Sequence, residues 1–231
     1  MTFSNLILIK YMHPKGSSSK IYIHPEGLKF AAIFFVVSFL LSYIWMPISY
    51  LGYFFTFFTL CFFRNPKRNT PQNPNSVISA ADGKVCLIDK ACPPKEADMG
   101  SDEMLRVCVF MNVFNVHINR SPIKGIINNV VYKEGSFLNA SLDKASEKNE
   151  RSSTIITNTN GSKLVVVQIA GLIARRIVSF VSPNQHLEQG ERFGLIRFGS
   201  RVDIYMPLSA AVNCKVGDKV IAGESLLATL S

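Results

Sequence analysis

The sequence contains little of what metal-binding, disulfide-rich or nucleic-acid-binding proteins depend on. Its five cysteines show no CxxC or similar spacing, and it has only four histidines in 231 residues. We therefore expect neither a metal site nor a full disulfide framework. No basic motif with interleaved aromatic residues occurs, which argues against nucleic acid as a partner. Residues 1–28 also lack the apolar core and the small-residue cleavage site of a signal peptide.

Residues 30–63 contain no charged residue, and this absence points to a membrane. The run is 34 residues long and holds 10 of the 17 phenylalanines. A single helical span needs about 20 residues, so the run is too long for one span and short for two. Pro47 and Gly52 lie near its middle, where a helix would break or kink. The pattern predicts a helical membrane hairpin, either re-entrant or made of two short helices. The alternative is a buried core hairpin of a soluble domain.

The net charge of +9 is concentrated around this run. Residues 1–68 hold seven Lys and Arg against one Glu, a net charge of +6. Basic residues at both ends of an apolar segment favour the cytoplasmic side and anionic lipids. We therefore expect a protein at the cytoplasmic face of a cell membrane, the inner membrane in a bacterium, held there peripherally or by its hairpin. The expected segments are 1–28 (basic N-terminus), 29–63 (membrane hairpin), 64–76 (linker) and 77–231 (β domain).

From Ser76 onward, short apolar runs alternate with Gly and Asn turns. Asp82-Gly83 and Asn160-Gly161 each predict a tight hairpin. Residues 138–150 are the one segment of this domain where a helix is expected. Many short strands with such turns are typical of a mostly β, antiparallel, sandwich or barrel-like fold with little helix. Further strands are expected within 105–110, 125–132, 175–181, 195–206 and 212–230.

One Gly-Ser pair lies in an unusual place. The chain has five such pairs, four of them in polar, turn-like surroundings. Only Gly199-Ser200 interrupts a β-rich run, where glycine weakens the strand. One interpretation is a bulge or a close approach of two backbones.

The other interpretation of Gly199-Ser200 is chemical. A serine hydroxyl held against the unshielded glycine carbonyl can attack it and convert the amide to an ester. Elimination would then release a chain ending at Gly199. The dehydroalanine left at position 200 would lose ammonia and become a pyruvoyl group.

Four stretches carry a resemblance to a known family. FGLIRFGSRVD, at residues 193–203, resembles the self-cleavage site of the short-form phosphatidylserine decarboxylases. Three further stretches are similar to the same family and follow its order: ISAADGKV (78–85), FNVHINRSP (114–122), and NERSS with QIAGLIARRIV (149–178). Together they extend from about Ile78 to the C-terminus.

The resemblance implies an enzyme that processes itself. The chain would be cleaved between Gly199 and Ser200 into fragments 1–199 and 200–231, which stay together as a heterodimer, alone or within a higher oligomer. Ser200 would become a covalent pyruvoyl cofactor. The substrate amine would form a Schiff base with this group, so that phosphatidylserine loses CO2 and becomes phosphatidylethanolamine. The expected partners are the phospholipid substrate and the membrane.

The resemblance also assigns roles to His117 and Asp82. His117 would act as the base for Ser200, or as the acid that protonates the substrate Cα; without the resemblance, it would be interpreted as a core residue. Asp82 would orient a histidine, as in a catalytic triad; its other interpretation is an ordinary turn residue. Longer bacterial members carry a second histidine three positions after the first, tied to cleavage, where this chain has Arg120. The base for self-cleavage therefore stays open.

Arginines near the Gly-Ser pair are candidates for substrate binding. Arg176, Arg197 and Arg201 could hold a phosphate or carboxylate, because the guanidinium fork suits both groups. Arginines alternating along strands are also common on protein surfaces.

A second class of function is a non-enzymatic carrier. VGDKVIAGESLL, at residues 216–227, resembles the glycine-turn strand pair of lipoyl and biotinyl carrier domains, and Asp89-Lys90-Ala91 resembles a lipoyl-lysine motif. A membrane-tethered carrier or adaptor would follow. In carrier domains, however, the lysine turn comes after the VGD segment, whereas Lys90 precedes Val216.

Overall fold

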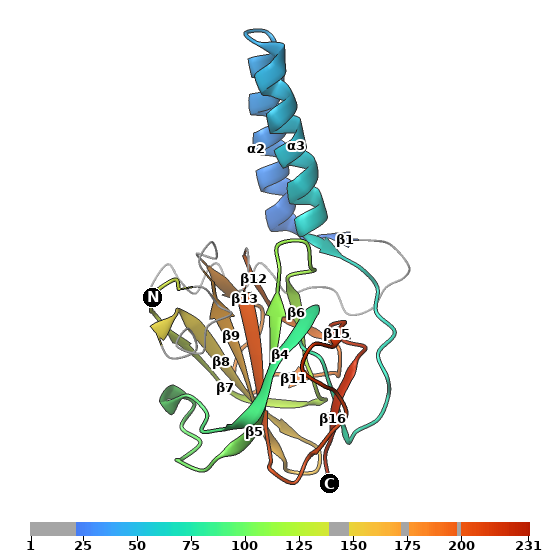
Figure 1. Ribbon diagram of the computed structural model, residues 1–231, viewed down its shortest axis with the longest axis vertical. Helices are drawn as coiled ribbons and strands as arrows, with labels where there is room; N and C mark the ends of the chain where they lie inside the picture. The colour runs from blue at the N-terminus through green and yellow to red at the C-terminus, as the bar shows by residue number, and fades with distance from the viewer. Residues whose placement is uncertain (1–21, 139–147, 172–175, 198–199) are drawn as a thin grey trace. The chain divides into compact units, whose positions relative to one another are not determined.

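The computed structural model describes residues 22–138, 148–171, 176–197 and 200–231. They belong to two compact units (Figure 1). A β unit contains Arg68–Asn112 and His117–Ser231, and a helical unit contains Ser18–Lys67 together with Val113–Val116. The chain therefore leaves the β unit for four residues directly before His117.

The helical unit is a hairpin of helices α2 (Pro25–Ser42) and α3 (Met46–Phe62). Two short strands, β1 (Tyr22–Ile23) and β2 (Arg64–Asn65), pair antiparallel at its base. The predicted break near the middle of the apolar run is confirmed. Pro47 lies in the first turn of α3, where a missing N–H costs little. Within the described residues, no helix combines the length and apolarity needed to cross a membrane.

The β unit is built around an antiparallel sheet of eight strands. In spatial order the strands are β11 (His186–Leu187), β7 (Gly125–Lys133), β8 (Arg151–Asn158), β9 (Lys163–Ala170), β13 (Ser200–Met206), β5 (Met104–Met111), β4 (Gly83–Ala91) and β15 (Lys219–Val220). The hairpin predicted at Asn160-Gly161 is confirmed, because β8 pairs with β9 and Gly161 has a φ of 83° in the turn. A left-handed φ of this kind favours glycine.

Two smaller antiparallel sheets of three strands each complete the unit. The first contains β10 (Ile177–Ser179), β12 (Arg192–Ile196) and β6 (Ile118–Arg120) in spatial order. The second contains β14 (Ala211–Val212), β16 (Leu226–Thr229) and β3 (Ser76–Ile78). A single 3-10 turn, η2 (Lys95–Ala97), is described outside the sheets. The prediction of a mostly β, antiparallel fold is therefore confirmed.

The hairpin predicted at Asp82-Gly83 is wrong. The strands on either side of this turn do not pair with each other: β3 pairs with β16, and β4 pairs with β5 and β15. Asp82-Gly83 therefore connects two sheets. An Asp-Gly pair predicts only a change of direction. The strand partners are set elsewhere in the chain: β16 for β3, and β5 and β15 for β4. Most of the helix expected at 138–150 lies outside the described residues.

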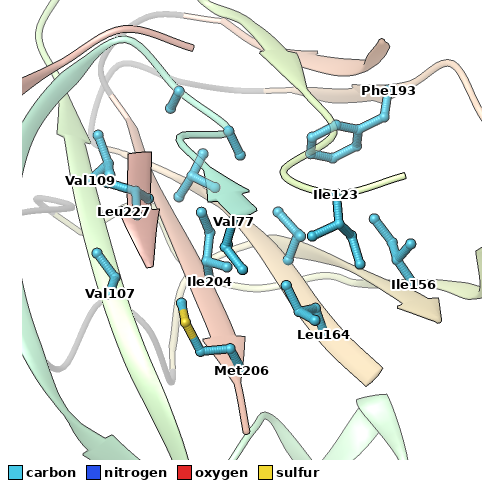
Figure 2. Packing of buried hydrophobic residues seen from close by; sticks show 14 of the residues in the cluster. Val77, Val107, Val109, Ile123, Ile156, Leu164, Phe193, Ile204, Met206 and Leu227 are labelled. Atoms are coloured by element: carbon cyan, nitrogen blue, oxygen red, sulfur yellow. The ribbon is translucent and has the colours of Figure 1, made fainter. Parts of the chain in front are cut away.

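Apolar side chains from all three sheets form one core. Figure 2 shows how labelled members from β5, β9, β12 and β13 point toward one another. Ile156, Leu164 and Val202 are fully buried. In a strand, alternate residues face opposite sides, so the neighbours of these residues lie on the other face of the large sheet.

That other face carries a buried network of charges. Arg201 donates from Nε and Nη2 to the two carboxylate oxygens of Asp203, over 2.6 and 2.7 Å. Arg106 donates to both oxygens of Asp89, over 2.8 and 2.6 Å, and its Nη1 lies 4.0 Å from Asp203. The hydrogen bonds to Asp89 outweigh burial and raise the pKa of Arg106 above its ordinary value. The network joins three adjacent strands, β4, β5 and β13.

We expect Asp203→Asn to lower the free energy of unfolding by about 3–5 kcal/mol, because it leaves buried Arg201 without its counter-charge. Asp89→Asn is the matched control: it belongs to the same network, but its side chain is 34% exposed. We expect it to cost about 1 kcal/mol or less. Urea titrations followed by circular dichroism measure both values. Equal losses would show that burial does not determine the strength of this network.

Candidate active site

Ser200 is the first residue of β13 and is fully buried. Its backbone pairs with Met111 of β5 on one side and with Ala170 of β9 on the other. Among the described residues, its Oγ finds no hydrogen-bond partner. A buried polar group without a partner costs about 1–3 kcal/mol and is uncommon, so this hydroxyl calls for a functional explanation. Gly199, predicted as the other half of the cleaved bond, lies outside the described residues.

His117 lies beside the strand that leads into Ser200. The backbone carbonyl of His117 accepts a hydrogen bond from Ile196 N–H, the last residue of β12, over 3.3 Å. The next residue, Arg197, donates its N–H to the carbonyl of Arg176 over 3.2 Å. His117 is only 2% exposed. Backbone hydrogen bonds thus bring His117 and Arg176 to the end of β12, just before Ser200 in the chain.

Two buried amide side chains lie on the same side of the large sheet as Ser200. Gln168 Nε2 donates to Asn119 Oδ1 over 2.8 Å, and Asn119 Nδ2 lies 3.7 Å from the sulfur of Met111. Met111 is paired directly with Ser200. Gln168 is two positions from Ala170 on β9, so its side chain points to the same face as that residue. Asn119 belongs to the motif FNVHINRSP and Gln168 to QIAGLIARRIV, but neither residue has a role predicted from the sequence.

The carboxylate of Asp82 is held in place by Arg68 and by a backbone amide. Arg68 Nη2 donates to its two oxygens over 2.9 and 2.8 Å, and Ala222 N–H donates to Oδ1 over 2.7 Å. Arg68 falls in the segment predicted as a linker, and here its side chain is largely buried in the β unit. The orientation of a histidine by Asp82 stays a prediction.

Arg120 occupies the place where longer bacterial members carry a second histidine. It lies opposite Arg192 in the pairing of β6 with β12. Burial, with the charges of Arg68 and Arg192, lowers the pKa of the Arg120 guanidinium to about 10, although nearby carboxylates oppose the shift. A group with this pKa remains protonated at neutral pH. Arg120 therefore does not replace a histidine as a base.

The three arginines proposed for substrate binding occupy different environments. Arg201 points to the face opposite Ser200, where it is 1% exposed and paired with Asp203. Burial alone would lower its pKa, but Asp203 outweighs this effect and raises the pKa above its ordinary value. Arg197 is half-buried and Arg176 is exposed. A role in substrate binding stays a prediction for all three.

The carrier interpretation does not fit the position of Lys90. This residue lies within β4, opposite Leu105 of β5, and not at a turn. A carrier domain must present its lysine at the tip of a hairpin, where a modifying enzyme can reach it.

Comparison with known families agrees with the motifs. Residues 55–228 match the family described as phosphatidylserine decarboxylase. The match covers far more than half of the chain and includes Asp82, His117, Gln168 and Ser200. The chain therefore belongs to the phosphatidylserine decarboxylase family.

Proposed function

We propose that this protein decarboxylates phosphatidylserine to phosphatidylethanolamine with a pyruvoyl group that it makes from its own Ser200. The observation that carries the proposal is the buried, unpartnered Oγ of Ser200 at the start of β13, in a chain of this family. The residue before Ser200 is a glycine, which has no side chain to shield its own carbonyl carbon.

Self-cleavage would take place in three steps. Ser200 Oγ loses its proton and bonds to the carbonyl carbon of Gly199, and the amide C–N bond breaks to leave an ester and a free amine. Loss of the Ser200 Cα proton then breaks the Cβ–O bond, which releases the Gly199 carboxylate and leaves dehydroalanine. Water replaces the amine, and ammonia departs. Since Arg120 stays protonated, we propose His117 as the base. It would take the hydroxyl proton of Ser200 and pass it to the amine that is released.

The neighbour of position 200 on β9 is small. Ala170, directly opposite, has a side chain of one methyl group. After cleavage, residues 201–205 would still pair with both β5 and β9, and Met206 with β5. Strands β15 and β16 of the same fragment pair with β4 and β3. These pairings would hold fragments 1–199 and 200–231 together as a heterodimer.

A pyruvoyl ketone takes up a primary amine and withdraws electrons from the bond between the substrate Cα and its carboxylate. The protein's own residues have the remaining tasks. His117 would deliver the proton to Cα once CO2 has left.

The helical hairpin supports attachment to a membrane. Helices α2 and α3 stack on each other through Phe34 and Phe55, whose ring centroids are 5.9 Å apart, yet they leave apolar side chains exposed on many sides. Phe57 is 67% exposed. The loop Val113–Val116 adds to this surface, because Phe114 is 73% exposed and its ring packs against Phe58. An exposed apolar surface of this extent marks a membrane or protein contact.

Basic residues at the base of the hairpin favour lipid over a protein partner. Arg64 donates from Nη1 to Cys61 O over 2.7 Å and from Nη2 to Phe114 O over 2.8 Å, and so ties the loop to the end of α3. Basic side chains beside an apolar segment are attracted to anionic head groups. We therefore propose that the hairpin holds the protein at the cytoplasmic face of the cell membrane.

Ser200→Ala should yield a single, inactive chain, because it removes the attacking oxygen. Intact mass spectrometry of purified wild-type protein should show two fragments, with the smaller one blocked by a pyruvoyl group at its N-terminus. The variant should instead show one uncut chain. Cleavage of the variant at the same bond would mean that another protease makes the cut.

His117→Ala is expected to lower decarboxylation by about 10²–10⁴-fold, the usual contribution of a positioned acid or base. His186→Ala is the matched control, since His186 is exposed on the edge strand β11. Release of CO2 from phosphatidylserine measures activity, and intact mass measures cleavage. A His117→Ala chain with normal cleavage and normal turnover would make His117 a core residue only.

Charged substitutions on the hairpin should release the protein from membranes. An Ile33→Asp, Phe57→Asp double variant places two charges at exposed apolar positions, each unfavourable by about 2–3 kcal/mol at the centre of a bilayer. Leu208→Asp with Val216→Asp is the matched control, because these apolar residues are similarly exposed on the β unit. Flotation with vesicles that contain anionic lipid separates the two outcomes. Equal binding of both double variants would place the membrane contact elsewhere.

A further inference from the structure

The amide of Gln168 is buried but only half satisfied. Its Nε2 donates to Asn119 Oδ1, while its Oε1 accepts no hydrogen bond from any described residue. The side chain is fully buried in the interior strand β9. A polar residue in the apolar run VVVQIA costs free energy unless both ends of its amide find partners. The described residues supply no donor to this Oε1 atom, so a donor from elsewhere would satisfy it.

The register of the sheet brings this oxygen within reach of position 200. Gln168 pairs with Val202, and Ala170 pairs with Ser200, so Gln168 is the diagonal neighbour of Ser200 across the strand pair. Diagonal neighbours on one face lie about 7–8 Å apart, within the reach of a long side chain. Ala170, directly opposite Ser200, carries only a methyl group on this face.

The backbone of β12 fixes where the amide can lie. A Cβ atom added to Gly194 would come within 2.9 Å of Gln168 Nε2 and 3.1 Å of its Oε1. The glycine thus allows β12 to pass directly over the amide. Asn119 pairs with Gly194 in the register of β6 and β12, and its Oδ1 accepts the hydrogen bond from Nε2. The amide is confined between the large sheet and β12, and its free oxygen belongs to the same interior face as Ser200.

Two donors could reach this oxygen, and they act at different stages. The Ser200 hydroxyl is one, but it has no partner in this structure and is consumed when the proposed pyruvoyl group forms. The other is the nitrogen of the substrate. A primary amine joined by a C=N bond to the ketone carbon, which is the former Cα of Ser200, would keep one N–H when protonated, and this N–H needs one acceptor.

We propose that Gln168 Oε1 accepts this hydrogen bond from the substrate nitrogen, which makes Gln168 a residue of the amine-binding site. The inference rests on the proposed function, because it requires the ketone of a pyruvoyl group at position 200. It assigns the site to primary amines, since a secondary amine joined in the same way would have no N–H left for Oε1.

The test uses an amine that binds without turnover. Glycerophosphoethanolamine has a primary amine and no carboxylate to lose. Its nitrogen joins the ketone with loss of water, and sodium cyanoborohydride then delivers a hydride that makes the C–N bond permanent. Intact mass of the fragment 200–231 reports the fraction trapped at each amine concentration.

Gln168→Met keeps the volume of the side chain but removes Oε1, so the amine concentration for half-maximal trapping should rise at least tenfold. Gln168→Glu retains an acceptor and loses the donor to Asn119, and we expect it to stay within about threefold of wild type. Ser153→Ala is the matched control. Ser153 also has a buried, unpartnered hydroxyl, but it lies opposite Val167 and so faces the other side of the sheet.

The outcomes separate this inference from the proposed function. A wild-type protein that is uncut and traps no amine overturns both. If wild type is cut and trapped while Gln168→Met shows an unchanged half-maximal concentration, only the role of Gln168 is wrong. A Gln168→Met chain that remains uncut would also overturn the inference, because the amide would then serve the precursor and not the substrate. An equal loss in Gln168→Glu would assign the effect to the bond with Asn119.

Discussion

The hydrogen bonding of β13 on both of its edges is the constraint on which the candidate active site depends. Pairing with β5 and β9 begins at Ser200 itself, so this residue is fixed in position. A strand with two partners cannot slip by one residue without turning every side chain to the wrong face. The serine is therefore held in one orientation by a strand that is paired on both edges.

Because side chains alternate along β13, the candidate active-site serine lies on one face of the sheet and a buried ion pair lies on the other. Ser200 and Val202 face the interior, where Gln168, Asn119 and the core residues lie. Arg201 and Asp203 face the other side and form a closed ion pair. Positive charges are thereby neutralised on the outer face. On the inner face, Ser200 Oγ and Gln168 Oε1 are among the buried polar atoms that find no partner in the described part of the chain.

Local sequence patterns predicted the elements of the fold better than their partners. The charge-free run with Pro47 near its middle became two helices, and the alternating apolar runs became antiparallel strands. The turn at Asp82-Gly83 was expected to join paired strands, but it leads from one sheet to another. A Gly-containing turn fixes only a change of direction, whereas strand partners depend on core packing across the whole chain. Arg68 illustrates the same limit: a residue in a Pro- and Asn-rich segment gave no local sign that it would bind Asp82.

The sequence by itself determined the apolar character of the helical hairpin and the position of the Gly199-Ser200 pair, because both depend on consecutive residues. It also carried the four motifs that relate the chain to its family. Only the tertiary structure decided that Ser200 is buried, that Arg201 points away from it and that Gln168 lies beside it. These relationships follow from register between strands that are distant in the chain. A single residue of slip would reverse them without changing any local pattern.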